Sequence, residues 1–331
     1  MEEKKARLFV NAPNALAGNE ISKCDTSSAA FQSEEAGIVD FVGDEAAVLG
    51  QIRDLVCMLP SNNEDDNSFV ECTDDLNRAE ASLANCVGDT SIALSTIADD
   101  NAFVEVKAAY AKEMVTGFMK LNGITVGAVA NRCEVYNDEG EKTASFDAAL
   151  SPAGCDKAAE FVSFCDAFNI PIVSLVDVPG FLPGTGQEYN GVILHGAKLL
   201  YAYGEATVPK VTITLRKSYG GSHIVMSCKQ LRGDMNYAWP TAEIAVMGGA
   251  GAVEVLFARE AKDQENPAQF LAEKEAEYTK LFANPYNAAK YGYIDDVIEP
   301  RNTRFRIIRA LQQLQTKKLT NPAKKHGNIP L

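Results

Sequence analysis

Two glycine-containing turns are the first candidates for chemistry, because each exposes main-chain N–H groups directly after a strand-like run. They lie in "VDVPGFLPGTGQEYNG" (176–191) and "RKSYGGSHIVM" (216–226). Glycine supplies the backbone freedom that such turns need and lets a ligand approach the main chain. The second turn opens a helix, whose first N–H groups have no acceptor within the helix and favour an anion. One such turn alone is commonly an ordinary tight turn, but two in one strand series indicate a backbone oxyanion site.

Catalysis by histidine has weaker support. Only His195, His223 and His326 occur, and none lies in a recognisable catalytic triad. His195 falls inside the apolar run "GVILHGAKLL", which indicates a core or interface role, and His326 lies in the polar tail. His223 follows the second turn by two residues, where we favour a place in a pocket wall over catalysis. No metal-binding motif appears either, so no protein-bound metal is expected.

Two further glycine motifs do not complete a nucleotide site. The "DVPG" at 177–180 looks like the metal-binding strand end of a GTPase, but the chain has no G-x-x-x-x-G-K-[ST] loop to accompany it. The "GGAGAVE" at 248–254 lacks the G-x-G-x-x-G spacing, and close packing of a helix on a strand is the better explanation for its glycines. Nucleotide hydrolysis is therefore not expected.

The composition limits the partners. The chain has 331 residues, 46% of them hydrophobic, and a net charge of −14. This is enough apolar content for a full core, and the negative charge argues against nucleic acid as a partner. The eight cysteines show no C-x-x-C pair, which is typical of a reduced protein. No apolar run approaches the ~18 residues of a membrane-spanning helix, and "MEEKKARLFVNAPN" lacks a signal-peptide core, so we expect a cytoplasmic protein.

Alternating strands and helices must position the two turns. The clearest local structure is a hairpin over 114–131, because two β-rich runs meet at Asn122-Gly123, a pair that favours a type I′ turn. From residue 155 onwards helical and apolar strand-like runs alternate, which predicts a layered α/β domain with a parallel sheet. The expected helices lie within 155–171, 191–206, 222–231, 251–260, 268–283 and 303–315, and the expected strands within 170–180, 210–217 and 242–248.

The N-terminal part is less regular. The stretch "AGIVDFVGDEAAVLGQIRDLVCMLP" (36–60) predicts a short strand followed by an amphipathic helix. The acidic, asparagine-rich stretch "SNNEDDNSFVECTDDLN" (61–77) has the composition of a linker. We therefore place a domain boundary inside it.

The quoted turns lie within a long region that resembles a known family. From "FNIPIVSLVDVPGFLPGTGQEYNG" through "RKSYGGSHIVMSCKQLRGDMNYAWPTAEIAVMGGAGAVEVLF", the chain is similar to the C-terminal half of carboxyltransferase β subunits of biotin-dependent acyl-CoA carboxylases. These subunits are of the propionyl-CoA carboxylase, methylmalonyl-CoA transcarboxylase and methylmalonyl-CoA decarboxylase type. The resemblance reaches the tail "PAKKHGNIPL" and extends more weakly to "LFVNAPNALAGNE" (8–20). It implies that residues 1–62 are a remnant resembling the end of the family's N-terminal half, and that 63–331 form the C-terminal carboxyltransferase domain.

The resemblance implies both a fold and a reaction. The fold is α/β and crotonase-like, a spiral of β-β-α units, and the reaction moves a carboxyl group between carboxybiotin and the α-carbon of a short acyl-CoA. In the family, backbone groups of the "VPGF" and "YGG" turns surround the ureido ring of biotin. The corresponding residues here are Gly180 and Phe181 for binding biotin, and Gly220, Gly221 and Ser222 for catalysis, with Gly221 and Ser222 also binding biotin.

General chemistry agrees with these roles. Negative charge develops on the ureido oxygen when carboxybiotin loses its carboxyl group, and preorganised N–H donors aimed there lower the barrier. Removing one such donor costs roughly 3 kcal/mol in comparable sites. The biotin enolate can itself take the α-proton of the acyl-CoA, so no side-chain base is required.

The chain also departs from the family. Members usually carry a first half that binds the acyl-CoA, so we expect a separate acyl-CoA-binding half as a partner. His223 stands where relatives often have tyrosine, and Ile224 stands where the acyl group is read, which fits a short apolar group. The acidic "YNDEGEK" (136–142) replaces a different pattern beside the expected site. The resemblance further implies a hexamer built of dimers, a biotin carrier protein and, for sodium-coupled decarboxylation, a membrane decarboxylase subunit.

Two other functions stay open at this point. One is a non-catalytic assembly subunit of such a complex. The other is a stand-alone crotonase-type hydrolase or isomerase acting on acyl-CoA, which would need a carboxylate over the oxyanion turn. Glu188 and Asp234 are the candidates for that carboxylate.

Overall fold

The computed structural model describes residues 1–12, 15, 25–65, 69–137 and 139–330. Most of "LFVNAPNALAGNE" (8–20), the centre of the predicted linker and one residue of "YNDEGEK" lie outside the described residues. Within the described part, no helix is both long and apolar enough to cross a membrane.

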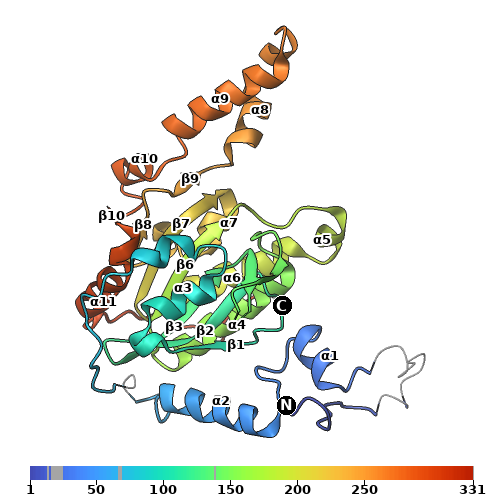
Figure 1. Cartoon of the computed structure of the whole chain (residues 1–331), viewed down its shortest axis with the longest axis vertical. Coiled ribbons are helices and arrows are strands. Elements are labelled where there is room, and N and C mark those ends of the chain that lie inside the picture. The colour runs from blue at the N-terminus through green and yellow to red at the C-terminus, as the bar shows by residue number, and fades with distance from the viewer. Residues whose placement is uncertain (13–14, 16–24, 66–68, 138, 331) are drawn as a thin grey trace.

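One sheet of eight strands organises the chain (Figure 1). Its order is β1-β2-β3-β6-β7-β8-β10, and β9 pairs with the end of β7. β2 is antiparallel to both of its neighbours, β1 and β3, whereas the pairs β3–β6, β6–β7, β7–β8, β7–β9 and β8–β10 are parallel. The strands of this sheet are β1 (Phe103–Val106), β2 (Met114–Leu121), β3 (Ile124–Asn131), β6 (Ile172–Val178), β7 (Lys210–Tyr219), β8 (Met235–Ala238), β9 (Glu243–Ala245) and β10 (Asp296–Val297); β4 (Glu134–Tyr136) and β5 (Lys142–Ser145) form a separate hairpin.

Helices fill the connections between the strands. The α-helices are α1 (Ala29–Glu34), α2 (Glu45–Met58), α3 (Thr90–Ile97), α4 (Pro152–Ala167), α5 (Thr185–Tyr189), α6 (Val192–Glu205), α7 (Gly220–Val225), α8 (Gly249–Lys262), α9 (Pro267–Leu281), α10 (Pro285–Lys290) and α11 (Thr303–Leu314). Short 3₁₀ helices are Ala81–Asn85, Asp99–Asn101, Lys229–Leu231 and Pro300–Asn302. The result is a layered α/β domain, as the alternation of runs predicts.

The predicted hairpin is confirmed. β2 and β3 pair over their full lengths, and the turn residues Asn122 and Gly123 have φ of 53° and 78°. Positive φ at both positions is what a type I′ turn requires. The Asp99 carboxylate accepts both N–H groups of the turn, at 3.0 and 2.7 Å, which fixes the turn from outside the hairpin.

Two large clusters of buried apolar residues lie on opposite faces of the sheet, and a smaller third cluster joins β8 and β9 to α10. All seven residues of β6 are buried, as expected for a parallel strand covered on both sides. Ile172 and Val176 pack with α4, α6 and the end of α2, whereas Val173 and Leu175 pack with α3 and α11. Alternate side chains of β6 therefore pack into the helix layers on opposite faces of the sheet.

Several elements differ from expectation. The strand expected before α2 is wrong: only an isolated bridge joins Gly43 to Glu2 there. The helix expected over 222–231 begins earlier, at Gly220, and ends at Val225, because the chain turns sharply through Ser227, which has φ of 63°. β1, β8, β10 and the β4–β5 hairpin were not anticipated, since each has only two to four residues per strand.

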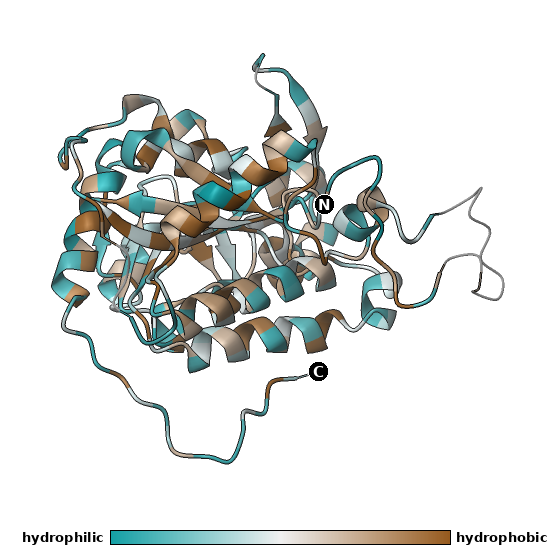
Figure 2. Cartoon of the chain, turned by 90° about the horizontal axis from the view of Figure 1, so that it is seen from below, coloured by the Kyte–Doolittle hydropathy of each residue, from teal (hydrophilic) through white to brown (hydrophobic). Residues whose placement is uncertain are grey.

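Two segments extend from the domain body. α8 and α9 form an arm that projects beyond β9, with α10 at its base (Figure 1). The C-terminal tail runs as an extended chain along the outside of the helices (Figure 2). Lys324 of the tail pairs with Glu205 of α6 at 2.7 Å, and the Asn328 N–H donates to the Tyr201 hydroxyl at 2.8 Å.

Candidate functional site

The two glycine turns meet because they follow neighbouring parallel strands. β6 ends at Val178, β7 ends at Tyr219, and Val178 pairs with Ser218 in the register of the sheet. The carboxyl ends of parallel strands lie at one edge of a sheet, where ligands of open α/β sheets commonly bind. The "VPGF" turn and the "YGG" turn therefore share this edge.

The ring of Phe181 lies between α6 and α7. A Cβ added to Gly196 of α6 would stand 2.6 Å from the Phe181 ring, and one added to Gly221 of α7 would stand 3.4 Å from it. The main chain of the turn is held as well, because Leu150 N–H donates to Gly180 O at 3.0 Å and Leu182 N–H donates to Leu150 O at 2.9 Å. The glycines thus leave room for the aromatic ring to bring the two turns together.

The first glycine of the "YGG" turn is required by its backbone. Gly220 has φ of +55°, and a Cβ there would stand 2.7 Å from the carbonyl oxygen of Val246. A side chain would suffer both the left-handed conformation and this contact. Gly221 has no such constraint and is exposed beside Phe181.

The side chains next to the "YGG" turn stabilise it through hydrogen bonds. Buried Ser222 donates its hydroxyl to Tyr219 O at 2.6 Å. The Tyr219 hydroxyl donates to the Glu243 carboxylate of β9. Burial and this hydrogen bond raise the pKa of Tyr219. These contacts tie the start of α7 to both strands that flank it.

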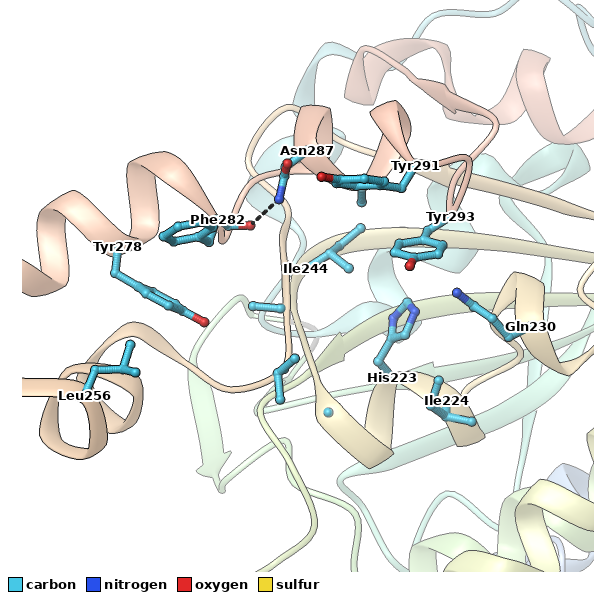
Figure 3. A pocket seen from close by; sticks show the side chains of 14 residues that line it. His223, Ile224, Gln230, Ile244, Leu256, Tyr278, Phe282, Asn287, Tyr291 and Tyr293 are labelled. Atoms are coloured by element: carbon cyan, nitrogen blue, oxygen red, sulfur yellow. Dashed lines mark hydrogen bonds between the residues drawn. The ribbon is translucent and has the colours of Figure 1, made fainter.

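A cavity of about 640 Å³ opens on the other face of α7 (Figure 3). Gly220, His223 and Ile224 line it, because positions i, i+3 and i+4 share one face of a helix. The rest of the wall comes from the 3₁₀ helix after α7, from β9 and the segment after it, and from the arm with the segment after it: Gln230, Ile244, Ala245, Val246, Leu256, Tyr278, Phe282, Asn287, Ala288, Tyr291 and Tyr293. The structure therefore separates a Phe181 side of α7 from a His223 side.

His223 is a wall residue of this cavity. Its Nδ1 and the Ser218 Oγ are 2.8 Å apart, and its ring points towards Tyr293 with the Gln230 amide beside it (Figure 3). Burial lowers the pKa of His223, so the imidazole is neutral near pH 7. A neutral ring held by a serine hydroxyl offers a hydrogen-bonding group to the cavity.

The remaining candidates are two histidines and two carboxylates. His195 lies near the first turn, since a Cβ on Gly191 would stand 3.7 Å from its ring. His195 Nδ1 and Lys198 Nζ each lie 2.8 Å from Asp156 Oδ1, so His195 joins α6 to α4. His326 is exposed in the tail. The suggestion that Asp234 stands over the oxyanion turn is wrong, because its carboxylate accepts from Lys210 N–H at 2.8 Å at the beginning of β7. Ten residues of strand, about 30 Å, separate that point from the "YGG" turn.

Glu188 is the other candidate carboxylate. It lies exposed on α5, which stands off from the sheet edge in Figure 1. Among the described residues, no three His, Cys, Asp or Glu side chains come together as metal ligands.

Sequence reasoning missed three contributors to this edge. Gly196 could have been found, because a glycine inside an apolar helix signals close packing. Ser218 and Asp177 gave no signal that distinguishes them from other polar residues in strands. Asp177 stands in the "DVPG" motif and is 4% exposed.

The comparisons with known proteins are consistent across the chain. The family described as "Carboxyl transferase domain" matches residues 1–329. The chain is 42% identical to the methylmalonyl-CoA decarboxylase subunit alpha of Propionigenium modestum, covering all of this chain and 64% of the relative. It is 47% identical to the propionyl-CoA carboxylase beta chain of Cereibacter sphaeroides, covering 98% of this chain and 63% of the relative.

A solved structure is similar over the whole chain. The transcarboxylase 12S crystal structure, a hexamer with methylmalonyl-coenzyme A and methylmalonic acid bound, superposes with a TM-score of 0.89 at 43% identity, covering all of this chain and 64% of that one. These matches confirm the predicted crotonase-like fold. The chain spans slightly less than two thirds of the length of these relatives.

Proposed function

This chain belongs to the carboxyl transferase family, and from that membership we propose that it is a carboxyltransferase subunit. It moves a carboxyl group between carboxybiotin, held on a carrier protein, and the α-carbon of a short acyl-CoA. The observation that carries the proposal is the meeting of the two glycine turns at one edge of the sheet, with the Phe181 ring between Gly196 and Gly221.

The residues at this edge fit a biotin ureido ring. Gly221 is exposed and presents main chain without a side chain, as a flat polar ring needs. The first N–H groups of α7 have no acceptor within the helix. Biotin, when bound, supplies a ureido oxygen that becomes negative as the carboxyl group leaves. In this proposal the N–H groups of Gly221 and Ser222 donate to that oxygen, and main-chain groups of Gly180 and Phe181 hold the ring from the other turn.

Each assigned residue then has one task. Gly220 gives the turn its left-handed backbone, and Gly221 and Ser222 donate N–H groups. Phe181 fixes the distance between the turns through its ring. No side chain is assigned as a base. Preorganised donors of this kind contribute roughly 3 kcal/mol each to a transition state.

The cavity on the other face of α7 supports a short apolar acyl group. Ile224, Ile244 and Leu256 make much of its wall apolar, and His223 adds one neutral polar group. We assign Ile224 and His223 to binding the acyl portion of the substrate. The names of the relatives agree in type, since they act on methylmalonyl-CoA and propionyl-CoA.

The proposal includes partners. The acyl-CoA half of the site comes from protein outside these 331 residues, and a biotin carrier protein brings the biotin. The assembly is a hexamer built of dimers, as the transcarboxylase 12S structure is a hexamer. Exposed apolar side chains on the arm, such as Val255 at 72% and Leu256 at 61%, support such an assembly. We place the carboxyltransferase domain at 63–331 and the remnant of the first half at 1–62.

The test is biotin-dependent activity of the assembled protein. The chain is purified with the partners that bind it, and decarboxylation of methylmalonyl-CoA is followed with and without biotin. We expect activity that requires biotin, and none from Gly221→Leu, because the leucine side chain would meet the Phe181 ring and cover the turn.

The matched control is Gly50→Leu. Gly50 is also a helical glycine, it lies on α2, and a Cβ there has no neighbour within 4 Å. The Gly50→Leu variant should therefore keep full biotin-dependent activity. Absence of biotin-dependent turnover from the assembled wild-type protein would contradict the proposed function, and equal activity of Gly221→Leu would favour a non-catalytic assembly role.

A further inference from the structure

Strand β7 has two extra residues relative to its neighbour β6 between two successive residue pairs of the sheet register. The strands pair without interruption from Ile172 with Lys210 to Val176 with Thr214. The next pair is Val178 with Ser218, so two steps along β6 match four steps along β7. The extra residues form a bulge directly before the "YGG" turn. Bulges re-aim the residues that follow them and are common beside active sites.

The buried carboxylate of Asp177 fills this bulge. Its Oδ2 accepts from Arg216 Nε at 2.9 Å and Nη2 at 2.5 Å, and its Oδ1 accepts from the Lys217 N–H at 3.0 Å. The Asp177 N–H donates to Asn131 Oδ1 of β3 at 3.2 Å. One carboxylate thus joins the residue before the end of β6 to two consecutive residues of the bulge in β7.

The pattern of buried residues does not by itself protect this register. A slip of one residue would turn every side chain of β7 to the wrong face, but a slip of two residues would keep the faces unchanged. A slip of two would carry the "YGG" turn about 7 Å along the strand. A specific polar contact is therefore needed to fix the bulge, and the Asp177 carboxylate makes three.

We propose that Asp177 is a positioning residue for the site, which holds the bulge of β7 so that Gly221 faces Phe181. The inference rests on the proposed function. It assigns the aspartate of "DVPG" a role that needs neither a nucleotide nor a metal. Asp177 stands four residues before Phe181, and Lys217 stands four residues before Gly221, so the same carboxylate sets the starting points of both turns.

The chain contains a matched control at the opposite end of the sheet. Asp99 is also buried, at 6% exposed, and it accepts from an arginine, Arg304 Nη2 at 2.7 Å. It also accepts main-chain N–H groups, those of Asn122 and Gly123. Asp177 and Asp99 therefore make the same kinds of contact, but only Asp177 lies beside the two glycine turns.

The experiment compares Asp177→Ala, Asp177→Asn and Asp99→Ala in the assembled protein. Hydrogen exchange is measured by mass spectrometry over 178–183 and 214–223, and kcat and KM are measured for biotin-dependent decarboxylation of methylmalonyl-CoA. We expect Asp177→Ala to speed exchange in both segments and to lower kcat by roughly 100-fold with KM nearly unchanged, since a displacement of about 1 Å can cost that much. Asp177→Asn keeps an acceptor for Lys217 N–H and should lie between Asp177→Ala and wild type in both measurements.

Asp99→Ala should destabilise the fold but leave kcat and the exchange of both segments unchanged. The inference is overturned if Asp177→Ala leaves the exchange of the two segments as in wild type, or if Asp99→Ala lowers kcat equally. Should Asp177→Ala not fold, Asp177→Asn decides the question by the same two readouts. The exchange result does not depend on activity, so a wild-type protein without biotin-dependent turnover would contradict the proposed function and still leave the positioning role tested.

Discussion

Single residues at the edge of the sheet matter here mainly through their main chain. In the proposed site Gly221 and Ser222 donate N–H groups, and the Phe181 ring fits against α6 because Gly196 lacks a side chain. The side chains that would usually attract attention, those of His195 and His223, hold the structure or line the cavity. The chemistry of the site is accordingly sensitive to backbone geometry more than to side-chain titration.

Gly220→Ala tests this sensitivity. Alanine at φ of +55° costs about 1–2 kcal/mol, and its Cβ would also stand 2.7 Å from Val246 O. We expect a loss of unfolding free energy clearly larger than that backbone cost, together with a loss of transfer activity. Urea unfolding and the decarboxylation assay measure the two effects.

Gly140→Ala is the matched control. Gly140 has φ of +77° in the β4–β5 hairpin, and nothing lies within 4 Å of a Cβ placed there. The Gly140→Ala variant should lose only the unfolding free energy that alanine costs at positive φ, and it should retain activity. Equal destabilisation by the two alanines would show that the contact with Val246 has no weight.

At the scale of elements, the sheet is held by polar groups that reach across layers. Lys157 of α4 is 2% exposed and donates from Nζ to Tyr110 O at 2.8 Å and Met114 O at 2.6 Å. Burial lowers the pKa of Lys157 to about 7. The lysine thus joins α4 to the start of β2, and its burial there makes the amine lose its proton more easily.

This buried amine predicts a pH dependence of stability. Between pH 7 and 10.5 the unfolded chain keeps the proton on Lys157 and the folded chain releases it, so the free energy of unfolding rises with pH. The rise is at most about 1.4 kcal/mol per pH unit for one group. Below pH 7 both states hold the proton, and the full penalty of burial remains.

Urea unfolding of wild type and Lys157→Met between pH 7 and 9 checks this. We expect wild type to gain stability relative to the variant as the pH rises. Lys318→Met replaces an exposed lysine and serves as the control, since its difference from wild type should stay constant. A constant difference for Lys157→Met as well would rule out the buried neutral amine.

The elements also show what sequence can and cannot predict. The hairpin over 114–131, α4, β6, α6 and β7 follow from period, turn residues and long apolar runs, because their signals are local. The strand expected near residue 40 is absent. The short strands β8 and β10 pair only with neighbours distant in sequence, so no local pattern marks them. For the site, the "VPGF" and "YGG" turns were predicted with the resemblance, but the bulge that aligns them was not. It depends on Asp177 and Arg216, 39 positions apart, and their pairing appears only in three dimensions.

At the scale of the molecule, the arm is the feature that the domain body does not explain. α8 and α9 leave Val255, Leu256, Leu281 and Phe282 more than half exposed. A helical pair that projects with apolar side chains outward is typical of a surface that another chain covers. This agrees with the proposed hexamer.

Val255→Asp tests the assembly. We expect a fall in mass from a multiple of 35.7 kDa towards smaller species, measured by sedimentation velocity, with unchanged circular dichroism. Ile38→Asp, which replaces a residue 60% exposed outside the arm, is the comparison. An unchanged mass for Val255→Asp would remove the arm from the interface.

The β2–β3 hairpin also has a consequence for how the chain is made. Its strands pair within 18 consecutive residues, so it can form in about 1–10 μs once both have left the ribosome. β6 and the turns of the site are synthesised later, and β3 must meanwhile present an unpaired edge. Such an edge can pair with another nascent chain. Synthesis between residues 131 and 172 is therefore an interval in which the edge of β3 is open to aggregation.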